Sequence, residues 1–193
     1  PHFYARGNNP QFHAFAKLMQ YMQRAAHLLT DGQPLIDAAI LYHAESEWST
    51  KKYQLFQKPM RELMEHQLDC DVIPAQILNE AYVEDKKLHI GMMTYSCLVL
   101  PGAMCEAEFV IKAAKKGLPV YAVDYTAVYD TYGNLLSDEF KKSVIETELK
   151  DLAANIRKNE GGYATFIADN GDTSFRDLRL YQIGHEKARV IML

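Results

Sequence analysis

The apolar segment Ile36-Asp-Ala-Ala-Ile-Leu-Tyr42 is followed at once by the polar segment His43-Ala-Glu-Ser-Glu-Trp-Ser49. The apolar run is too short for a helix of ordinary length, and it has the composition of a parallel strand that is buried on both faces. In open α/β sheets, ligands bind beyond the carboxyl ends of such strands. We therefore predict that Ile36–Tyr42 is the first strand of a parallel sheet, and that residues 43–48 form a loop with a candidate binding site.

The other apolar runs alternate with helical patterns, which predicts a parallel sheet with helices on both faces. The fold class is accordingly α/β, with three layers and a flavodoxin-like sheet. Four more strands are expected, at Asp69–Pro74, Ser96–Leu100, Leu118–Asp124 and Tyr163–Ala168. Apolar residues at three- and four-residue steps predict helices at Lys51–Gln67, Cys105–Lys116 and Asp138–Ile156. Pro59 is expected either to begin the first of these helices or to kink it.

The two ends of the chain have patterns of their own. A helix is expected from Gln11 to Leu29, and an alternating pattern around Gly184–Lys187 predicts a C-terminal β-hairpin. The chain stops inside an apolar run, which would leave a strand edge unpaired, so we expect a piece of a longer protein. The predicted divisions are a helical segment at 1–33, an α/β domain at 34–170, and a hairpin at 171–193 that begins a further β module.

Composition narrows the class of protein. The 193 residues are 48% hydrophobic and 24% charged, as in a soluble globular domain. A net charge of -4 with dispersed Lys and Arg argues against nucleic-acid binding, and no apolar stretch could span a bilayer, which argues against a membrane partner. The three cysteines, Cys70, Cys97 and Cys105, lack metal-like spacing. We expect reduced thiols in a cytoplasmic protein without a bound metal.

His43, Glu45, Glu47 and Trp48 form the densest group of polar and aromatic residues beyond a predicted strand. Carboxylates can bind sugar hydroxyl groups while an indole ring stacks on the CH face, so these four are the candidate substrate-binding residues. The alternative is a loop that only caps a helix and packs Trp48 over a domain interface. Glycoside hydrolysis needs two acids that flank one bond, whereas these carboxylates lie two residues apart on one segment. We therefore assign no catalytic residue to this chain.

The same region bears on two other chemistries, nucleotide binding and cysteine-dependent catalysis. A phosphate site needs a Gly-rich turn after a strand, and the acidic, Gly-free segment after Tyr42 would repel phosphate, so no nucleotide or flavin cofactor is expected. Cys105 follows the Pro101-Gly102 turn near a predicted helix start, where a thiolate could be stabilised. A Cys-dependent amidohydrolase therefore stays as a further alternative, although no histidine is placed to act as its base.

The chain resembles a known family over residues 34–125. The similar segments are Ala38-Ala-Ile-Leu-Tyr-His-Ala-Glu-Ser-Glu-Trp48, Cys70-Asp-Val-Ile-Pro74, Tyr95-Ser-Cys-Leu-Val-Leu-Pro101 and Lys116-Gly-Leu-Pro-Val-Tyr-Ala-Val-Asp124. They resemble the glutamine-amidotransferase-like domain that follows the catalytic barrel in bacterial glycoside hydrolases, such as β-galactosidases with a trimerisation domain and large α-L-rhamnosidases. Residues 2–32 resemble the end of the preceding barrel.

The resemblance implies a class I amidotransferase-like sheet and places the hydrolytic carboxylates in a barrel outside this chain. In amidotransferases a Cys on a Gly-flanked turn follows the strand that matches Val120–Val123, but here Asp124-Tyr125 takes that place. The implied function is non-catalytic assembly and shaping of the active-site rim in carbohydrate hydrolysis. The implied partners are the adjacent barrel, other copies in a homo-oligomer, and carbohydrate. The alternative is an independent sugar-binding or small-molecule-binding module that uses residues 43–48.

Overall fold

Every side chain of β2 (Ala38–Leu41) is buried, because the strand is covered on both of its faces. Ala38 and Ile40 belong to one hydrophobic core, and Ala39 and Leu41 belong to the other, since successive side chains of a strand point to opposite faces. The computed structural model describes residues 9–160, 165–176, 180–185 and 189–192. The apolar run in the sequence is thus a two-sided central strand, as predicted.

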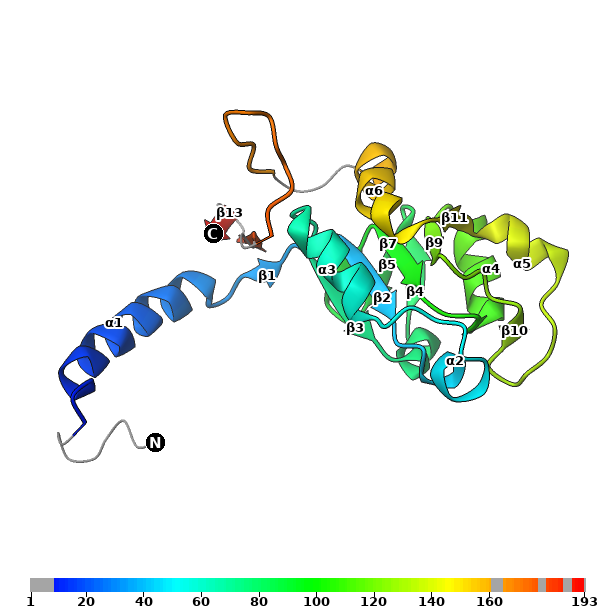
Figure 1. Ribbon diagram of the computed structural model, residues 1–193, viewed down its shortest axis with the longest axis horizontal. Coiled ribbons are helices and arrows are strands. Elements are labelled where there is room, and N and C mark those ends of the chain that lie inside the picture. Colours follow the sequence, from blue (N-terminus) through cyan, green and yellow to red (C-terminus); the bar gives the residue numbers. More distant parts are fainter. Residues whose placement is uncertain (1–8, 161–164, 177–179, 186–188, 193) are drawn as a thin grey trace.

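A five-stranded parallel sheet forms the middle layer (Figure 1). Its strands in spatial order are β11 (Ile145–Thr147), β9 (Val120–Val123), β7 (Cys97–Leu100), β2 and β3 (Cys70–Ile73). Ala38 of β2 is paired with Cys70 on one side and Cys97 on the other. The chain order reverses between β2 and β7, which is the switch point of a doubly wound, flavodoxin-like sheet. The predicted fold class is confirmed.

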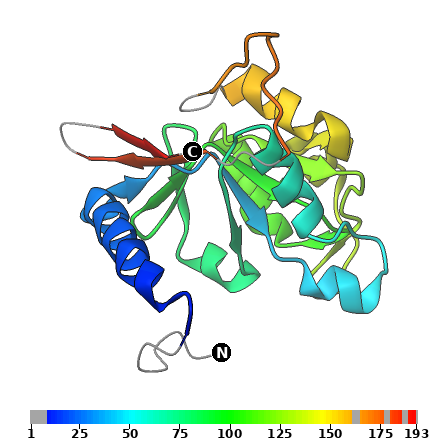
Figure 2. The same cartoon turned by 60° about the vertical axis from the view of Figure 1, so that its left-hand side comes forward.

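Helices cover both faces of this sheet (Figure 2). On one face, α3 (Gln57–Glu65) and α6 (Leu152–Glu160) contribute Leu63 and Ile156 to a core with Ile40. On the other face, α4 (Ala107–Lys115) and α5 (Asp138–Ser143) contribute Val110 and Phe140. A small antiparallel sheet completes this second layer, and its strands are β4 (Tyr82–Glu84), β5 (Lys87–Ile90) and β6 (Met93–Tyr95).

Each strand of the central sheet is followed by one short element beyond its carboxyl end. In chain order these elements are α2 (Ala44–Ser49), η2 (Ala75–Asn79), β8 (Met104–Cys105), β10 (Tyr129–Asp130) and η3 (Leu149–Asp151). β8 and β10 pair with each other in parallel. This edge therefore has its own layer of short helices and strands, and the candidate site lies within it.

The predicted fifth strand at Tyr163–Ala168 is wrong. Residues 165–168 are not in a strand, while 163 and 164 lie outside the described residues. The fifth strand is β11, which interrupts the helix predicted over Asp138–Ile156. The β-branched side chains of Val144, Ile145 and Thr147 favour an extended backbone, and β11 gains a partner in β9. The apolar residues on either side keep a helical spacing, so the break is not visible in the periodicity.

Two further predictions need correction near the candidate site. Residues 44–49 form the short helix α2 and not a loop. The helix predicted over Lys51–Gln67 is shorter, because α3 begins at Gln57 and Pro59 lies in its first turn, where a missing N–H group is tolerated. The segment before it is extended, and Tyr53 forms an antiparallel bridge with Gly102.

The helix predicted at Cys105–Lys116 is confirmed as α4, with Gly117 in a left-handed conformation after its end.

The N-terminal helix and the C-terminal hairpin are both confirmed, and they lie together. The helix is α1 (Phe12–Leu29), and the hairpin consists of β12 (Tyr181–Gly184) and β13 (Arg189–Met192). β1 (Gln33–Pro34) pairs with β12, which gives a three-stranded antiparallel sheet. α1 projects away from the central sheet (Figure 1). Within the described part of the chain, no helix combines the length and hydrophobicity needed to cross a membrane.

A half-buried acid at the amino end of β3, Asp69, predicts how stability depends on pH. Burial raises the pKa of Asp69 to about 6, and the carboxylate of Asp71 adds to the effect. Between about pH 4 and about pH 6 the folded chain keeps this proton, whereas the unfolded chain, whose pKa is 3.8, has released it. Asp69 therefore lowers the free energy of unfolding as the pH rises through this range. We expect Asp69→Asn to stabilise the chain by about 1 kcal/mol above that range, since partial exposure weakens the effect.

Urea unfolding of the parent and Asp69→Asn chains, at about pH 4 and about pH 8, measures this difference. The two chains should be nearly equal at the lower pH and should separate at the higher one. Asp85→Asn is the control, because Asp85 is exposed and asparagine tolerates its left-handed backbone with φ +47°. A gain at low pH that disappears at high pH would contradict the assignment.

Candidate functional site

The switch point between β2 and β7 is closed by direct packing. Ser46 Oγ accepts a hydrogen bond of 2.9 Å from the backbone N–H of Met104, so α2 is fastened to β8. Gly102 lies directly against this contact: a Cβ atom there would be 2.5 Å from Ser46 Oγ and 3.0 Å from His43 Cβ. The crevice that usually receives a ligand in a doubly wound sheet is thus filled by the protein's own side chains.

The extended segment before α3 closes the same place from outside. The backbone N–H of Gln54 donates to Pro101 O at 2.7 Å, and that of Ala103 donates to Lys52 O at 3.0 Å. These two bonds flank the bridge between Tyr53 and Gly102. The turn after β7 is therefore held by both α2 and the segment that follows α2.

His43 faces the interior of this region, and the partly exposed side chain of Glu47 lies beside it. The His43 side chain is only 1% exposed, and its Nε2 atom is 3.4 Å from Glu47 Oε1. Its ring centroid is 5.4 Å from that of Tyr53. Burial lowers the pKa of the imidazole, and the Glu47 carboxylate opposes this effect. The imidazole is therefore neutral at physiological pH and serves the packing beneath α2.

Glu45 and Trp48 lie on the outer side of α2. They are three residues apart, which places them on one face of the helix. Trp48 is 81% exposed, whereas Ser46 between them is fully buried. The four residues proposed from the sequence thus differ in exposure: His43 is buried, Glu45 and Glu47 are partly exposed, and Trp48 is available to a partner or a ligand.

A second exposed aromatic group lies beside α2, and the sequence analysis missed it. Tyr129 of β10 is paired with Met104, whose other neighbour is Ser46 of α2. The turn that follows exposes Tyr132 to 87% and Leu135 to 75%. The Asp130-x-x-Gly133 turn pattern was visible in the sequence, but nothing there indicated that this turn would come to lie next to α2.

The carboxylate of Asp130 makes this turn rigid. It accepts hydrogen bonds from the backbone N–H groups of Tyr132 at 2.9 Å and Asn134 at 2.8 Å, and one from Asn134 Nδ2 at 2.9 Å. The Asn134 bonds hold the pKa of Asp130 below its ordinary value. Because the backbone of this turn is already fixed, Tyr132 and Leu135 would lose little conformational entropy on contact with a partner.

Asp124, which takes the place of the amidotransferase cysteine in the resemblance, has a left-handed backbone with φ +59°. Its Oδ1 atom accepts from Leu149 N at 2.9 Å, and Oδ2 accepts from the Gln54 side chain. It borders an acidic hollow of about 250 Å³. The lining residues are Ala122, Asp124, Thr126, Glu146, Thr147 and Glu148. Within the described residues, no group of His, Cys, Asp and Glu side chains is arranged to hold a metal ion.

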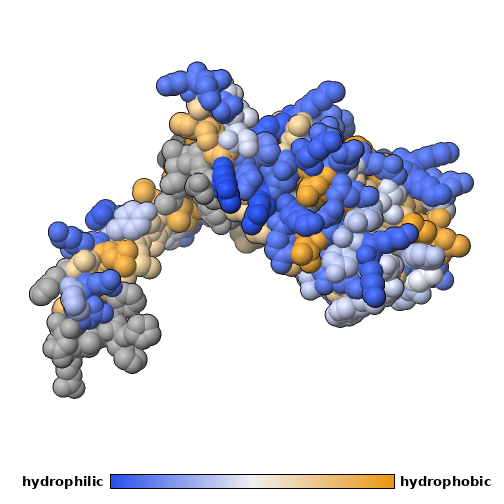
Figure 3. Space-filling model, in the orientation of Figure 1, coloured by the Kyte–Doolittle hydropathy of each residue, from blue (hydrophilic) through white to orange (hydrophobic). Residues whose placement is uncertain are grey.

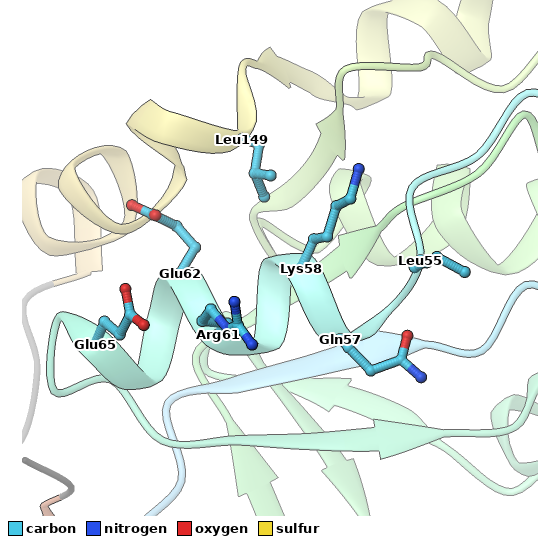
Figure 4. Close-up of a pocket in the computed structure, with 7 residues that line it drawn as sticks. All are labelled: Leu55, Gln57, Lys58, Arg61, Glu62, Glu65 and Leu149. Carbon is cyan, nitrogen blue, oxygen red and sulfur yellow. The ribbon is translucent and has the colours of Figure 1, made fainter. Parts of the chain in front are cut away.

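A larger hollow of about 350 Å³ lies on the outer face of α3 (Figure 4). Its lining residues are Leu55, Gln57, Lys58, Arg61, Glu62, Glu65 and Leu149. Lys58 and Glu62 rise from α3 towards Leu149 in this view. Burial raises the pKa of Glu62, and His66 Nδ1 lies 3.2 Å from its Oε1 atom. Because the lining carries both signs of charge, it favours neither an anion nor a cation.

Cys105 is a buried thiol in β8 and does not lie at the start of α4. Burial raises the pKa of Cys105, with the nearby carboxylates of Glu106 and Asp130 adding to the effect. A cysteine nucleophile needs the opposite environment, one that lowers the pKa and admits a substrate. Cys70 and Cys97 are also buried, and none of the three cysteines forms a disulfide.

Comparisons with known proteins are sparse for this chain. No family model matches it, and no curated protein matches it. Among solved structures, it is similar to the apo exo-carrageenase GH42 from Bacteroides ovatus, with a TM-score of 0.48 and 15% sequence identity. The similarity covers 76% of this chain and 22% of the carrageenase chain, so this chain spans less than a quarter of the length of that protein.

The closed switch point predicts the effect of one added methyl group. Gly102→Ala would place a Cβ atom against Ser46 and His43, and we expect a loss of about 2 kcal/mol in the free energy of unfolding through overpacking. In a chain that already carries Ser46→Gly, the same substitution should cost at least about 1 kcal/mol less. A double-mutant cycle from denaturant unfolding measures this coupling. Equal costs in both chains would show that Ser46 does not limit the space at Gly102.

Proposed function

We propose that this chain is a non-catalytic, amidotransferase-like α/β domain of a larger glycoside hydrolase. Its role would be assembly of the parent protein and shaping of the active-site rim in carbohydrate hydrolysis. The sequence resemblance over residues 34–125 and the five-stranded parallel sheet support this proposal. The closed switch point is the observation that carries it.

The closed crevice separates this domain from an enzyme of the same architecture. Doubly wound enzymes place their reacting groups in the crevice where the strand order reverses. Here Ser46, Gly102 and His43 fill that volume, and the exposed side chains stand around it on α2 and on the turn after β10. Groups that face outward in this way are suited to contact with another protein surface or with the edge of a substrate.

The exposed helix α1 supports a neighbouring domain as a partner. Leu18, Tyr21, Met22 and Leu28 are all about half exposed, and hydrophobic side chains are visible along the arm that α1 forms (Figure 3). An isolated helix of this length is only marginally stable in water. We infer that the preceding barrel covers this face, that residues 1–33 belong with that barrel, and that residues 171–193 begin a following β module.

The same proposal covers the cellular compartment and the oligomeric state of the parent protein. Three buried cysteines, none of them in a disulfide, fit a reducing compartment, so we place the parent protein in the cytoplasm. The exposed aromatic side chains near the carboxyl edge fit a homo-oligomer, because exposed apolar patches commonly mark protein contacts.

The absence of catalysis from this chain can be tested directly. We expect the purified chain to show no hydrolysis of nitrophenyl β-galactoside or nitrophenyl α-rhamnoside, because the proposal places the two acids of that reaction in the barrel. A preparation from cells that do not express the chain measures background turnover. Turnover above this background that rises in proportion to chain concentration would overturn the proposal.

Sugar binding by this chain alone is the second candidate, and one observation favours it. Trp48 presents an exposed ring on the same helical face as Glu45, the combination of stacking surface and carboxylate that suits a sugar. Under this alternative, calorimetric titration with galactose or rhamnose gives a binding heat that Trp48→Ala removes and Trp48→Phe largely keeps. Binding heat unchanged by Trp48→Ala would exclude a Trp48 site.

A further inference from the structure

The connection between α6 and β12 contains neither a helix nor a strand in its described residues 165–176, which we call the strap. Figure 1 shows the strap as the orange loop that leads to the C-terminal hairpin. It reverses direction at its tip, where Ala168 N donates to Asp172 O at 3.0 Å and Gly171 N donates to Ala168 O at 2.8 Å. Long connections without regular structure are uncommon in compact domains and are usually either functional or disordered. The bonds within the strap and around it favour a functional connection.

One side chain of the α/β domain joins the two legs of the strap. Gln67 follows the end of α3, is only 3% exposed, and has a left-handed backbone with φ +60°. Its Nε2 atom donates to Phe166 O and to Thr173 O, each at 2.8 Å, and its Oε1 atom accepts from Phe166 N at 2.6 Å. Both amide hydrogens and the amide oxygen are therefore used. The amide pairs with Phe166 as the backbone of a neighbouring strand would, and it adds a bond to the opposite leg.

The strap also satisfies polar groups at the end of α3. The last carbonyl groups of a helix have no partner within the helix. Here Glu65 O accepts from Phe175 N at 2.8 Å, and His66 O accepts from the guanidinium of Arg157 on α6. Arg157 Nη1 also donates to Thr165 Oγ1 at 2.6 Å. The first leg of the strap is thus bonded to α6 and the second leg to α3, so both helices on this face of the sheet hold it.

The hairpin that follows the strap reaches the same place. Leu180, directly before β12, is only 8% exposed. It lines a small void together with Met64, Gln67, Leu68 and Asp69. Further along, Leu35 N donates to Gln182 O at 2.9 Å beside the pairing of β1 with β12. Gln67 therefore lies where the strap, the end of α3 and the start of the hairpin meet.

We propose that the strap fixes the orientation of the C-terminal hairpin on the α/β domain, and that Gln67 is the positioning residue on which this depends. Without the bonds of the strap, the hairpin would be attached by a flexible connection, by Leu180 and by its pairing with the two residues of β1. With them, the direction in which the chain leaves the domain is set. This inference goes beyond the proposed function, because it concerns two parts of this chain and holds whatever the parent protein does.

The three bonds require a glutamine at position 67. A glutamate has nearly the same shape, but its carboxylate has no hydrogen to donate and would face two carbonyl oxygens. An alanine would leave the N–H of Phe166 and the carbonyl groups of Phe166 and Thr173 without this partner. None of the three bonds involves a residue of the central sheet. We therefore expect both substitutions to release the strap while the sheet stays folded.

Hydrogen exchange followed by NMR tests the strap residue by residue. In the parent chain, the amides of Phe166 and Phe175 should exchange at least about a hundredfold more slowly than in an unstructured peptide. Gln67→Ala and Gln67→Glu should each reduce this protection at least about tenfold, while the amides of Ile40 and Val99 in the central sheet stay protected. Gln57→Glu is the matched control, because Gln57 is an exposed glutamine at the other end of α3. This control should leave the strap protected.

The distance between two spin labels measures the orientation of the hairpin. Suitable label positions are Lys112→Cys on α4, where the side chain is 70% exposed, and Ile191→Cys on β13, where it is 48% exposed. The three native cysteines are buried, so the introduced ones carry the labels. The parent chain should give one narrow distance distribution, and Gln67→Ala should widen it at least about twofold, as for a flexible linker.

A second variant acts from the strap itself. Phe166→Pro removes the N–H group that Gln67 Oε1 accepts, and Phe166 is 45% exposed, so the folding of the α/β domain does not depend on it. It should widen the distance distribution as Gln67→Ala does, and it gives the same test if Gln67→Ala fails to fold.

Three results would overturn the proposal. Fast exchange of the Phe166 and Phe175 amides in the parent chain would show that the strap is not held. Unchanged protection in both Gln67 variants would show that other contacts hold it. A narrow distance distribution that persists in Gln67→Ala and in Phe166→Pro would show that the hairpin is oriented without the strap. None of these results depends on the nitrophenyl glycoside assay, so the role of the strap and the non-catalytic role can fail separately.

Discussion

The contact between Gly102 and Ser46 sets the arrangement at the carboxyl edge of the sheet. β2 and β7 are adjacent there, but the chain leaves them in different directions, so the space between their ends must be filled either by a ligand or by the protein. A glycine after β7 allows α2 to approach closely, and Ser46 Oγ then accepts from Met104 N at 2.9 Å. Once α2 is fixed in this way, His43 is buried beneath it and Trp48 is turned to solvent. The burial of His43 and the exposure of Trp48 are thus consequences of one close approach, whereas Glu45 and Glu47 are both partly exposed.

Much of the fold was predictable from the sequence because three of the five central strands, β2, β7 and β9, are continuous apolar runs. Such runs arise where a strand is covered on both faces, and β2 and β7 show this clearly, with all eight side chains buried. The fifth strand was misplaced because β11 lies at the edge of the sheet, where Ile145 and Glu146 are exposed. An edge strand of three residues gives no apolar run. Its flanking residues, Phe140 and Leu152, face opposite layers of the structure, although their spacing alone is compatible with one helix.

The sequence predicted the position of the candidate site in the chain correctly, but it did not predict the local structure of the site. Polar residues directly after a buried strand indicated the carboxyl edge, and residues 43–48 do lie there. Periodicity over six residues was too short to reveal that they form a helix, so the burial of His43 was not predictable. The contribution of Tyr132 depends on a tertiary contact, the pairing of Tyr129 with Met104, which joins two segments 25 residues apart. Short-range sequence patterns do not indicate a contact of that kind.

Asp124 shows how a conformation associated with catalysis can serve a structural role. A residue at the carboxyl end of a central strand with φ +59° is under backbone strain, and such strain persists only where the surroundings hold it in place. Here Asp124 N donates to Thr147 O at 2.9 Å, Tyr125 N donates to Val123 O at 2.7 Å, and the carboxylate receives Leu149 N. The strained residue therefore ties β9 to β11 and to the start of the last helical segment. Its side chain accepts a hydrogen bond from the backbone that it orders, so Asp124 joins β9 to the segment that follows β11.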